Sequence, residues 1–516
     1  MNIKQAKNEI KDAVEAYLAK DEYGEYIIPI ESQRPLLLIG APGIGKTAIM
    51  KQVASECGIG LVSYTITHHT RQSAIGLPYI SQKEFGGKEY AVTEYTMSEI
   101  VASVYNQMEE TGLKEGILFI DEINCASETL APAMLQFLQY KTFGSHKVPD
   151  GWIIVSAGNP PEYNKSVREF DIVTLDRVKK IDVEEDYDVW KEYAVKQNVH
   201  SAIISYLDVR KENFYTVRNT AEGKMFTTAR GWEDLSRIMT VYEKLKKPVT
   251  FDVIYQYLQN KKIAKDFAGY FELYNKYKKD YSITGILAGE IEDAYVDRLR
   301  LASFDEKLSV ISLILSALND DFKKADFLDM FVTELHTVLK DIKASLLSKF
   351  AEDKRPEDMI MPIIEMRKNA FEKKKKTGLM KRDEERFELK IQERLEEMLI
   401  ALKGEGISKC SDAFEYLKEL FASDVEKRST FMDDTGYKLD NAFSFLEYVF
   451  GESQEMVVFV TELNSGYYSI KFIDENGCVK FYQHNKNLLF KERQRNIISD
   501  IDEINAMMDS LKQRKQ

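Results

Sequence analysis

Cysteine and proline are scarce in this sequence, and long apolar runs are missing. The four cysteines among 516 residues are isolated, with no C-x-x-C pair and no histidine at ligand spacing. That pattern argues against both a disulfide framework and a structural zinc site. With only 11 prolines and 26 glycines, the chain has neither a fibrous nor a disordered composition. No apolar run reaches the roughly 20 residues of a membrane-spanning helix, so we expect a soluble globular protein.

Basic residues are also fewer than acidic ones. The sequence has 71 Lys and Arg against 84 Asp and Glu, a formal charge of −13. The surface as a whole therefore repels phosphate backbones, and generic nucleic-acid binding is disfavoured. The first stretch, MNIKQAKNEIKDAVEAYLAK, is charged throughout and lacks the apolar region of a secretory signal. We therefore expect a cytoplasmic protein.

Short β-like runs alternate with helical patterns between residues 31 and 186. After an N-terminal helix within residues 1–30, the predicted strands are Leu36–Ile39, Leu61–Ile66, Ile117–Ile120, Trp152–Ala157 and Val178–Val183. This alternation predicts an α/β fold, in which helices cover both faces of a parallel sheet.

The remaining sequence is predicted to be mainly helical. Helical patterns continue over residues 187–335, which we interpret as a second domain, and over the charged residues 336–450, which contain the run Lys373–Lys376. Between Met456 and Phe481, β-branched and aromatic segments are separated by N-S-G and E-N-G turns. Residues 451–516 are therefore predicted to form a small antiparallel β-meander and a C-terminal helix.

The segment GAPGIGKT follows the first predicted strand and opens a helix. It satisfies the pattern G-x-x-x-x-G-K-[ST], in which glycines let backbone N–H groups surround phosphate oxygens. Lys46 is expected to reach the β- and γ-phosphates, and the Thr47 hydroxyl is expected to bind Mg²⁺. The predicted nucleotide contacts are Gly40, Ala41, Pro42, Gly43, Ile44, Gly45, Lys46, Thr47 and Ala48.

Polar side chains follow two further predicted strands. GILFIDEIN places Asp121 and Glu122 at the carboxyl edge of the sheet, where open α/β sheets bind ligands. Asp121 suits the metal, and Glu122 suits orienting or deprotonating an attacking water, which favours hydrolysis over phosphate transfer. GNPPEYN brings Asn159 to the same edge, where its amide can bond the water or the γ-phosphate, or support the P-P turn.

Two arginines complete the candidate set. Arg177 precedes the last predicted strand in LDRV, and Arg230 opens a helix in FTTARGWEDL. From the residues alone, either can equally be an ordinary surface arginine.

Taken in order, these segments resemble the AAA+ ATPases over about residues 30–330, and within them the MoxR-like and dynein-related branch. The resemblance implies a P-loop NTPase αβα sandwich with a five-stranded parallel sheet, followed by a helical lid domain. It makes Gly40–Thr47 the Walker A motif and Asp121 with Glu122 the Walker B pair. It also implies a first sensor at Asn159, an arginine finger at Arg177 and a second sensor at Arg230 on the lid. Candidate catalytic residues are thus Lys46, Glu122, Asn159 and Arg177, and candidate metal ligands are Thr47 and Asp121.

The resemblance also implies an assembly and a role. An arginine finger from an adjacent subunit requires a ring, by analogy a homo-hexamer. The implied activity is hydrolysis of ATP with Mg²⁺, used for chaperone-like remodelling of a protein client, with a von Willebrand factor A-domain protein as partner. Gly76–Tyr95 is a predicted β-hairpin that faces the pore or a partner, or is a surface loop without contacts. One departure is Cys125, where MoxR-like proteins usually have Arg after D-E-I-N.

A second hypothesis is a nucleotide-dependent, possibly GTP-using, subunit of a nucleic-acid-directed restriction or defence system. The dynein-related branch includes such subunits, and the run Lys373–Lys376 gives weak electrostatic support. The formal charge of −13 ranks this hypothesis lower. Beyond about residue 340 no chemistry is identified, because His336 and His484 stand alone in the sequence.

Overall fold

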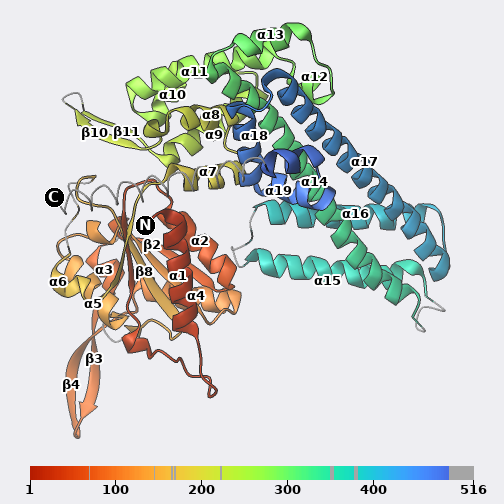
Figure 1. Ribbon diagram of the computed structural model, residues 1–516. Helices are drawn as coiled ribbons and strands as arrows, with labels where there is room; N and C mark the ends of the chain where they lie inside the picture. Colours follow the sequence, from red (N-terminus) through yellow and green to blue (C-terminus); the bar gives the residue numbers. More distant parts are fainter. Residues whose placement is uncertain are drawn as a thin grey trace, which may run out of the picture.

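The computed structural model describes residues 1–68, 70–143, 146–163, 167, 170–220, 223–348, 354–376, 380 and 382–486. Figure 1 shows an α/β domain, coloured red to orange, beside a large helical region, coloured yellow-green to blue. No helix among the described residues combines the length and apolarity needed to cross a bilayer.

Five parallel strands form the sheet of the α/β domain. Their spatial order is β2 (Gly60–Thr65), β5 (Gly116–Asp121), β8 (Trp152–Gly158), β1 (Leu36–Gly40) and β9 (Lys179–Val183). In the middle of the sheet, β1 pairs with β8 and β9, with Leu38 opposite Ala157 and Ile181. Such strands are buried on both faces, which explains their continuous apolar sequences. The predicted five-stranded parallel sheet is confirmed.

Helices cover both faces of this sheet (Figure 1). On one face Leu36 and Leu38 pack with α1 and α2, whereas Leu37 points to the opposite core under α4 and α5. This alternation follows from the two-residue period of a strand. The helices are α1 (Ile3–Leu18), α2 (Lys46–Cys57), α3 (Arg71–Ile75), α4 (Glu99–Thr111), α5 (Ala131–Tyr140) and α6 (Ile172–Leu175).

Two antiparallel hairpins are attached to the α/β domain. The longer one, β3 (Pro78–Phe85) with β4 (Lys88–Tyr95), confirms the hairpin predicted within Gly76–Tyr95 and protrudes from the domain in Figure 1. The shorter one pairs β6 (Thr142–Phe143) with β7 (His146–Lys147).

The helical region begins with α7, directly after β9. Its first helices are α7 (Tyr187–Lys196), α8 (Ser201–Val209), α9 (Ala229–Lys244), α10 (Phe251–Leu258) and α11 (Lys261–Asp280). These helices share one core. Contrary to the prediction of helices alone, a hairpin of β10 (Thr216–Thr220) and β11 (Gly223–Thr227) lies between α8 and α9.

Two long helices organise the rest of the helical region. They are α14 (Phe304–Leu346) and α17 (Cys410–Phe450), and α14 continues through the boundary predicted between residues 335 and 336. One half of each helix packs in a core with α12, α13, α18 and α19, and the other half packs in a core with α15 and α16. The remaining bounds are α12 (Ile283–Leu287), α13 (Asp293–Leu301), α15 (Pro356–Lys376), α16 (Arg382–Gly404), α18 (Gln454–Ser465) and α19 (Tyr467–Asn476).

The predicted β-meander between Met456 and Phe481 is wrong. This segment forms α18, α19 and a further helical stretch at 479–486. The buried side chains of α18 include Met456, Phe459, Val460 and Leu463, which recur at helical spacing and pack into the core. Helical periodicity and tertiary burial therefore outweigh the β propensity of the individual residues. The expected C-terminal helix beyond residue 486 lies outside the described residues.

A partly buried ionic cluster joins the C-terminal helices to α7. Lys191 Nζ lies 2.7 Å from Asp208 Oδ1 and 2.5 Å from Glu462 Oε1, so it bridges α7, α8 and α18. Burial lowers the Lys191 pKa, but the two carboxylates outweigh this and hold it above its ordinary value. Because α7 is the first helix after β9, the cluster connects the start of the helical region with α18.

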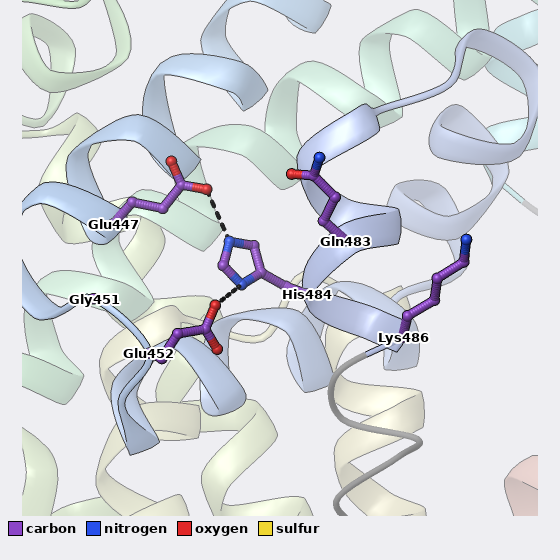
Figure 2. A pocket seen from close by; sticks show the side chains of 6 residues that line it. All are labelled: Glu447, Gly451, Glu452, Gln483, His484 and Lys486. Carbon is purple, nitrogen blue, oxygen red and sulfur yellow. Dashed lines mark hydrogen bonds and ion pairs between the residues drawn. The ribbon is translucent and has the colours of Figure 1, made fainter.

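His484 has close partners that the sequence does not reveal. Figure 2 shows its imidazole between two glutamates, with Nε2 2.8 Å from Glu447 Oε1 and Nδ1 3.3 Å from Glu452 Oε1. Its ring also stacks on Phe443. These contacts hold the 479–486 stretch against the end of α17. No cluster of three potential metal ligands occurs among the described residues.

Candidate nucleotide-binding site

The loop between β1 and α2 has the backbone shape of a phosphate-binding site. Gly43 and Gly45 have φ values of 78° and 100°, which side chains with a Cβ rarely tolerate. Such left-handed turns direct successive N–H groups toward one concavity, which favours anions. At Gly40, a Cβ would lie 2.5 Å from the carbonyl oxygen of Val183, so glycine also permits the close approach of β9.

Lys46 begins α2 and lies at the centre of the site. Only 7% of its surface is exposed. Its Nζ donates to the carbonyl oxygens of Gly40 (2.7 Å) and Ala41 (2.8 Å) and to Asn159 Oδ1 (3.0 Å). Burial lowers its pKa to about 8, the nearby Arg230 acts in the same direction, and Asp121 and Glu122 oppose the shift. An ammonium group whose charge is only partly compensated is well suited to receive a polyanion.

Thr47 and Asp121 form the predicted metal-binding pair. The Thr47 hydroxyl donates to Asp121 Oδ2 over 2.8 Å, and the other carboxylate oxygen accepts the backbone N–H of Glu122 over 2.9 Å. One hydroxyl and one carboxylate are oxygen ligands of the kind that Mg²⁺ prefers, with phosphate and water completing its octahedron. The donor set therefore fits Mg²⁺ at Thr47 and Asp121.

Glu122 is held by a residue that sequence reasoning missed. Its Oε2 accepts a hydrogen bond from the Thr67 hydroxyl over 2.9 Å. Its backbone lies in the left-handed region at φ 57°, where the chain turns sharply out of β5. Thr65 pairs with Asp121 in the sheet, so a residue just beyond β2 lies next to one just beyond β5, a relation that only the strand order reveals.

Asn159 lies at the same edge, directly after β8. It accepts from Lys46 through its side chain, and its backbone is bonded to the side chain of Asn124. The predicted convergence of Lys46, Thr47, Asp121, Glu122 and Asn159 is therefore present in the structure. Asn124, like Thr67, was not among the residues predicted from sequence.

The hairpin β10–β11 brings the helical region to the phosphate loop. The residues flanking it are Tyr215 and Thr228. The Tyr215 hydroxyl donates to the carbonyl oxygen of Pro42 over 3.0 Å, and the backbone N–H of Arg230 donates to the carbonyl oxygen of Gly43 over 3.3 Å. A Cβ on Gly43 would lie 3.1 Å from that of Thr228. Arg230, the second residue of α9, thus lies beside the loop, and its side chain is exposed.

Arg177 lies apart from this group. Its side chain is exposed, and its guanidinium donates to Gln139 Oε1 on α5 over 2.7 Å. Among the interactions of the described residues, none joins Arg177 to Lys46, Asp121 or Glu122. The structure therefore does not bring Arg177 into the site of its own chain.

Comparison with known families agrees with this geometry. Residues 36–173 match the family described as ATPase family associated with various cellular activities (AAA). The matched segment runs from β1 to α6 and contains the phosphate loop, Asp121, Glu122 and Asn159. This segment is therefore similar to the AAA domain of that family. Among curated proteins, no significant match to the chain was found.

Proposed function

We propose that this protein binds ATP with Mg²⁺, hydrolyses it, and uses the cycle to remodel or assemble a protein client. The observation that carries the proposal is the convergence of Lys46, the Thr47–Asp121 pair, Glu122 and Asn159 at one edge of one sheet. Ligands of open parallel sheets bind at the carboxyl ends of the strands, so this convergence supports the binding of one triphosphate there.

Each residue has a distinct part in the proposed hydrolysis. The loop N–H groups and Lys46 bind the phosphate oxygens, and Lys46 exchanges its carbonyl contacts for them. Thr47 and Asp121 would hold Mg²⁺, which offsets the charge of the phosphates. Glu122, released from Thr67, accepts a proton from the attacking water while Asn159 orients that water or the γ-phosphate. Arg230 would sense the nucleotide from the helical region.

We further propose a homo-hexameric ring of the MoxR-like type in the cytoplasm. Arg177 would act on the nucleotide of the neighbouring subunit, which its exposure and its hydrogen bond to Gln139, outside the local site, support. Ile172 and Val173, just before Arg177, are 84% and 56% exposed, which would favour a protein contact there. A von Willebrand factor A-domain protein is the proposed partner.

Loss of the Lys46 side chain is expected to abolish tight ATP binding. Lys46→Ala removes the buried cation that faces the phosphates, so the dissociation constant for ATP should rise at least about 100-fold. Lys51→Ala, on an exposed position of the same helix, serves as the matched control and should bind as the wild type does. Calorimetric titration with ATP and with GTP measures both affinity and base preference. Equal affinities of the two variants would contradict the proposed site.

ATP affinity should also fall at alkaline pH. The Lys46 pKa is about 8 in the free protein, below its ordinary value of 10.5, and a bound triphosphate would raise it again. Below pH 8 Lys46 is already protonated, so its contribution to binding is complete. Above pH 8, Lys46 must take up a proton when ATP binds. The affinity for ATP should therefore fall by up to about tenfold for each pH unit.

The measurement is the ATP dissociation constant between pH 7.5 and 9.5. Lys46→Arg is the control, because guanidinium stays charged throughout this range, and its affinity should change little with pH. Parallel pH profiles for the two proteins would show that Lys46 is not the titrating group.

The alternative role in nucleic-acid-directed defence gains no support from the lysine run. Lys374 and Lys375 lie 3.8 Å and 2.6 Å from Glu384 and Glu385 on the neighbouring helix α16. These ion pairs reduce the positive potential that α15 offers to a phosphate backbone. We therefore retain remodelling of a protein client as the proposed function.

A further inference from the structure

Asn124 is almost completely buried beside the candidate site, with 6% of its surface exposed. It lies in the short helical turn Ile123–Cys125, which follows Glu122 at the end of β5. Its amide nitrogen donates to the carbonyl oxygen of Asn159 over 2.8 Å, and its amide oxygen accepts the Asn159 N–H over 3.3 Å. The amide nitrogen and oxygen of Asn124 are thus bonded to the carbonyl oxygen and the N–H of Asn159, respectively.

This pairing replaces a missing strand contact. On the side of β5, the parallel ladder with β8 ends at Ser156 opposite Ile120, so Asn159 lies three residues beyond the last pair. A side-chain amide offers one donor and one acceptor in the same plane, as the peptide groups of a neighbouring strand would. Asn124 therefore bonds the chain just beyond β8 from the side of β5, where the strand ladder no longer reaches.

Gly158 provides the space that this contact needs. A Cβ at Gly158 would lie 2.6 Å from Asn124 Oδ1, which is closer than real Cβ contacts. The absence of a side chain at residue 158 and the amide at residue 124 are therefore parts of one local arrangement.

We propose that Asn124 is a positioning residue, which fixes the backbone of Asn159 so that the Asn159 side chain faces Lys46 and the γ-phosphate. The inference rests on the proposed hydrolysis of ATP. Asn124 also sits two residues after Glu122, so it links the Glu122 turn of β5 to the Asn159 turn of β8. Asn124 therefore fixes the position of Asn159 relative to Glu122, whether or not nucleotide is bound.

Asn124→Ala tests the inference by separating turnover from binding. Without the amide, Asn159 loses two backbone hydrogen bonds and its side chain is no longer fixed, so kcat should fall about 100-fold. Affinity for ATP should stay within about threefold of the wild type, because the loop and Lys46 supply it. In an Asn159→Ala background, Asn124→Ala should cause no further loss of kcat.

Gly158→Ala is the second variant, and it reaches the same contact from the other side. Its added Cβ should displace the Asn124 amide and reproduce the fall in kcat with ATP affinity retained. Gly436→Ala is the matched control, because a Cβ there meets nothing within 4 Å. Gly158→Ala also covers the case in which Asn124→Ala does not fold, as judged by thermal melting.

The outcomes separate this inference from the proposed function. If Asn124→Ala lowers kcat by the same factor in the wild type and in the Asn159→Ala background, the positioning role is overturned. Weaker ATP binding with an unchanged kcat would overturn it as well. A wild-type protein that binds no nucleotide would instead contradict the proposed function itself.

Discussion

Replacing Glu122 with glutamine is expected to slow ATP turnover by about 10²- to 10⁴-fold while leaving ATP bound. The amide keeps the size of the side chain and one oxygen that can still accept from Thr67. It loses the basic carboxylate that would take a proton from water. Lys46, Thr47 and Asp121 are unchanged, so affinity should stay close to that of the wild type. Single-turnover phosphate release and equilibrium binding measure the two quantities separately.

Two further variants sharpen the Glu122 experiment. Glu110→Gln, at an exposed position of α4, changes the same functional group away from the site and should leave turnover unaltered. Thr67→Val removes the donor that engages Glu122 and should raise basal turnover by about tenfold, which corresponds to about 1.4 kcal/mol, close to the low end for a hydrogen bond to a charged group. Wild-type turnover in Glu122→Gln would contradict the assignment of Glu122 as the base.

The core of the site could be predicted because its residues are tied to local sequence patterns. The phosphate loop needs glycines at fixed spacing, and Asp121 and Glu122 end a continuously apolar segment, so both follow from short stretches of chain. Parallel strand ends meet at one edge, which placed Asn159 as well. Thr67 and Asn124 escaped notice because their importance depends on contacts across the sheet with residues 55 and 35 positions away.

Local propensity failed where tertiary packing decides. Val457, Val458 and Tyr468 favour strands in isolation, yet their segments bury an apolar stripe at helical spacing against α14 and α17. The hairpin β10–β11 was not predicted because its strands, of five residues each, carry little periodic signal. His484 acquires Glu447 and Glu452 only through the folding of the C-terminal helices.

Arg177→Ala is expected to lower ATP turnover by about 10³- to 10⁵-fold, the effect of losing an arginine that stabilises charge on the γ-phosphate. Affinity for ATP should change little, because the phosphate loop that binds it is intact. The residue is exposed and bonded to Gln139 rather than to its own site. The proposed contribution of Arg177 would therefore come from contact with another copy of the chain. Steady-state turnover measured well above the assembly concentration checks the loss.

Mixing two inactive variants tests whether Arg177 acts on the nucleotide of a neighbouring subunit or on that of its own subunit. Arg177→Ala subunits retain a complete nucleotide site, and Lys46→Ala subunits retain the arginine. In mixed assemblies some Arg177→Ala sites would face an intact arginine, so turnover should reappear. The double variant Lys46→Ala/Arg177→Ala offers no arginine and should restore nothing when added to Arg177→Ala. Absence of recovery in mixtures shown to contain both subunits would place the action of Arg177 within its own chain, and a ring would then no longer be required for hydrolysis.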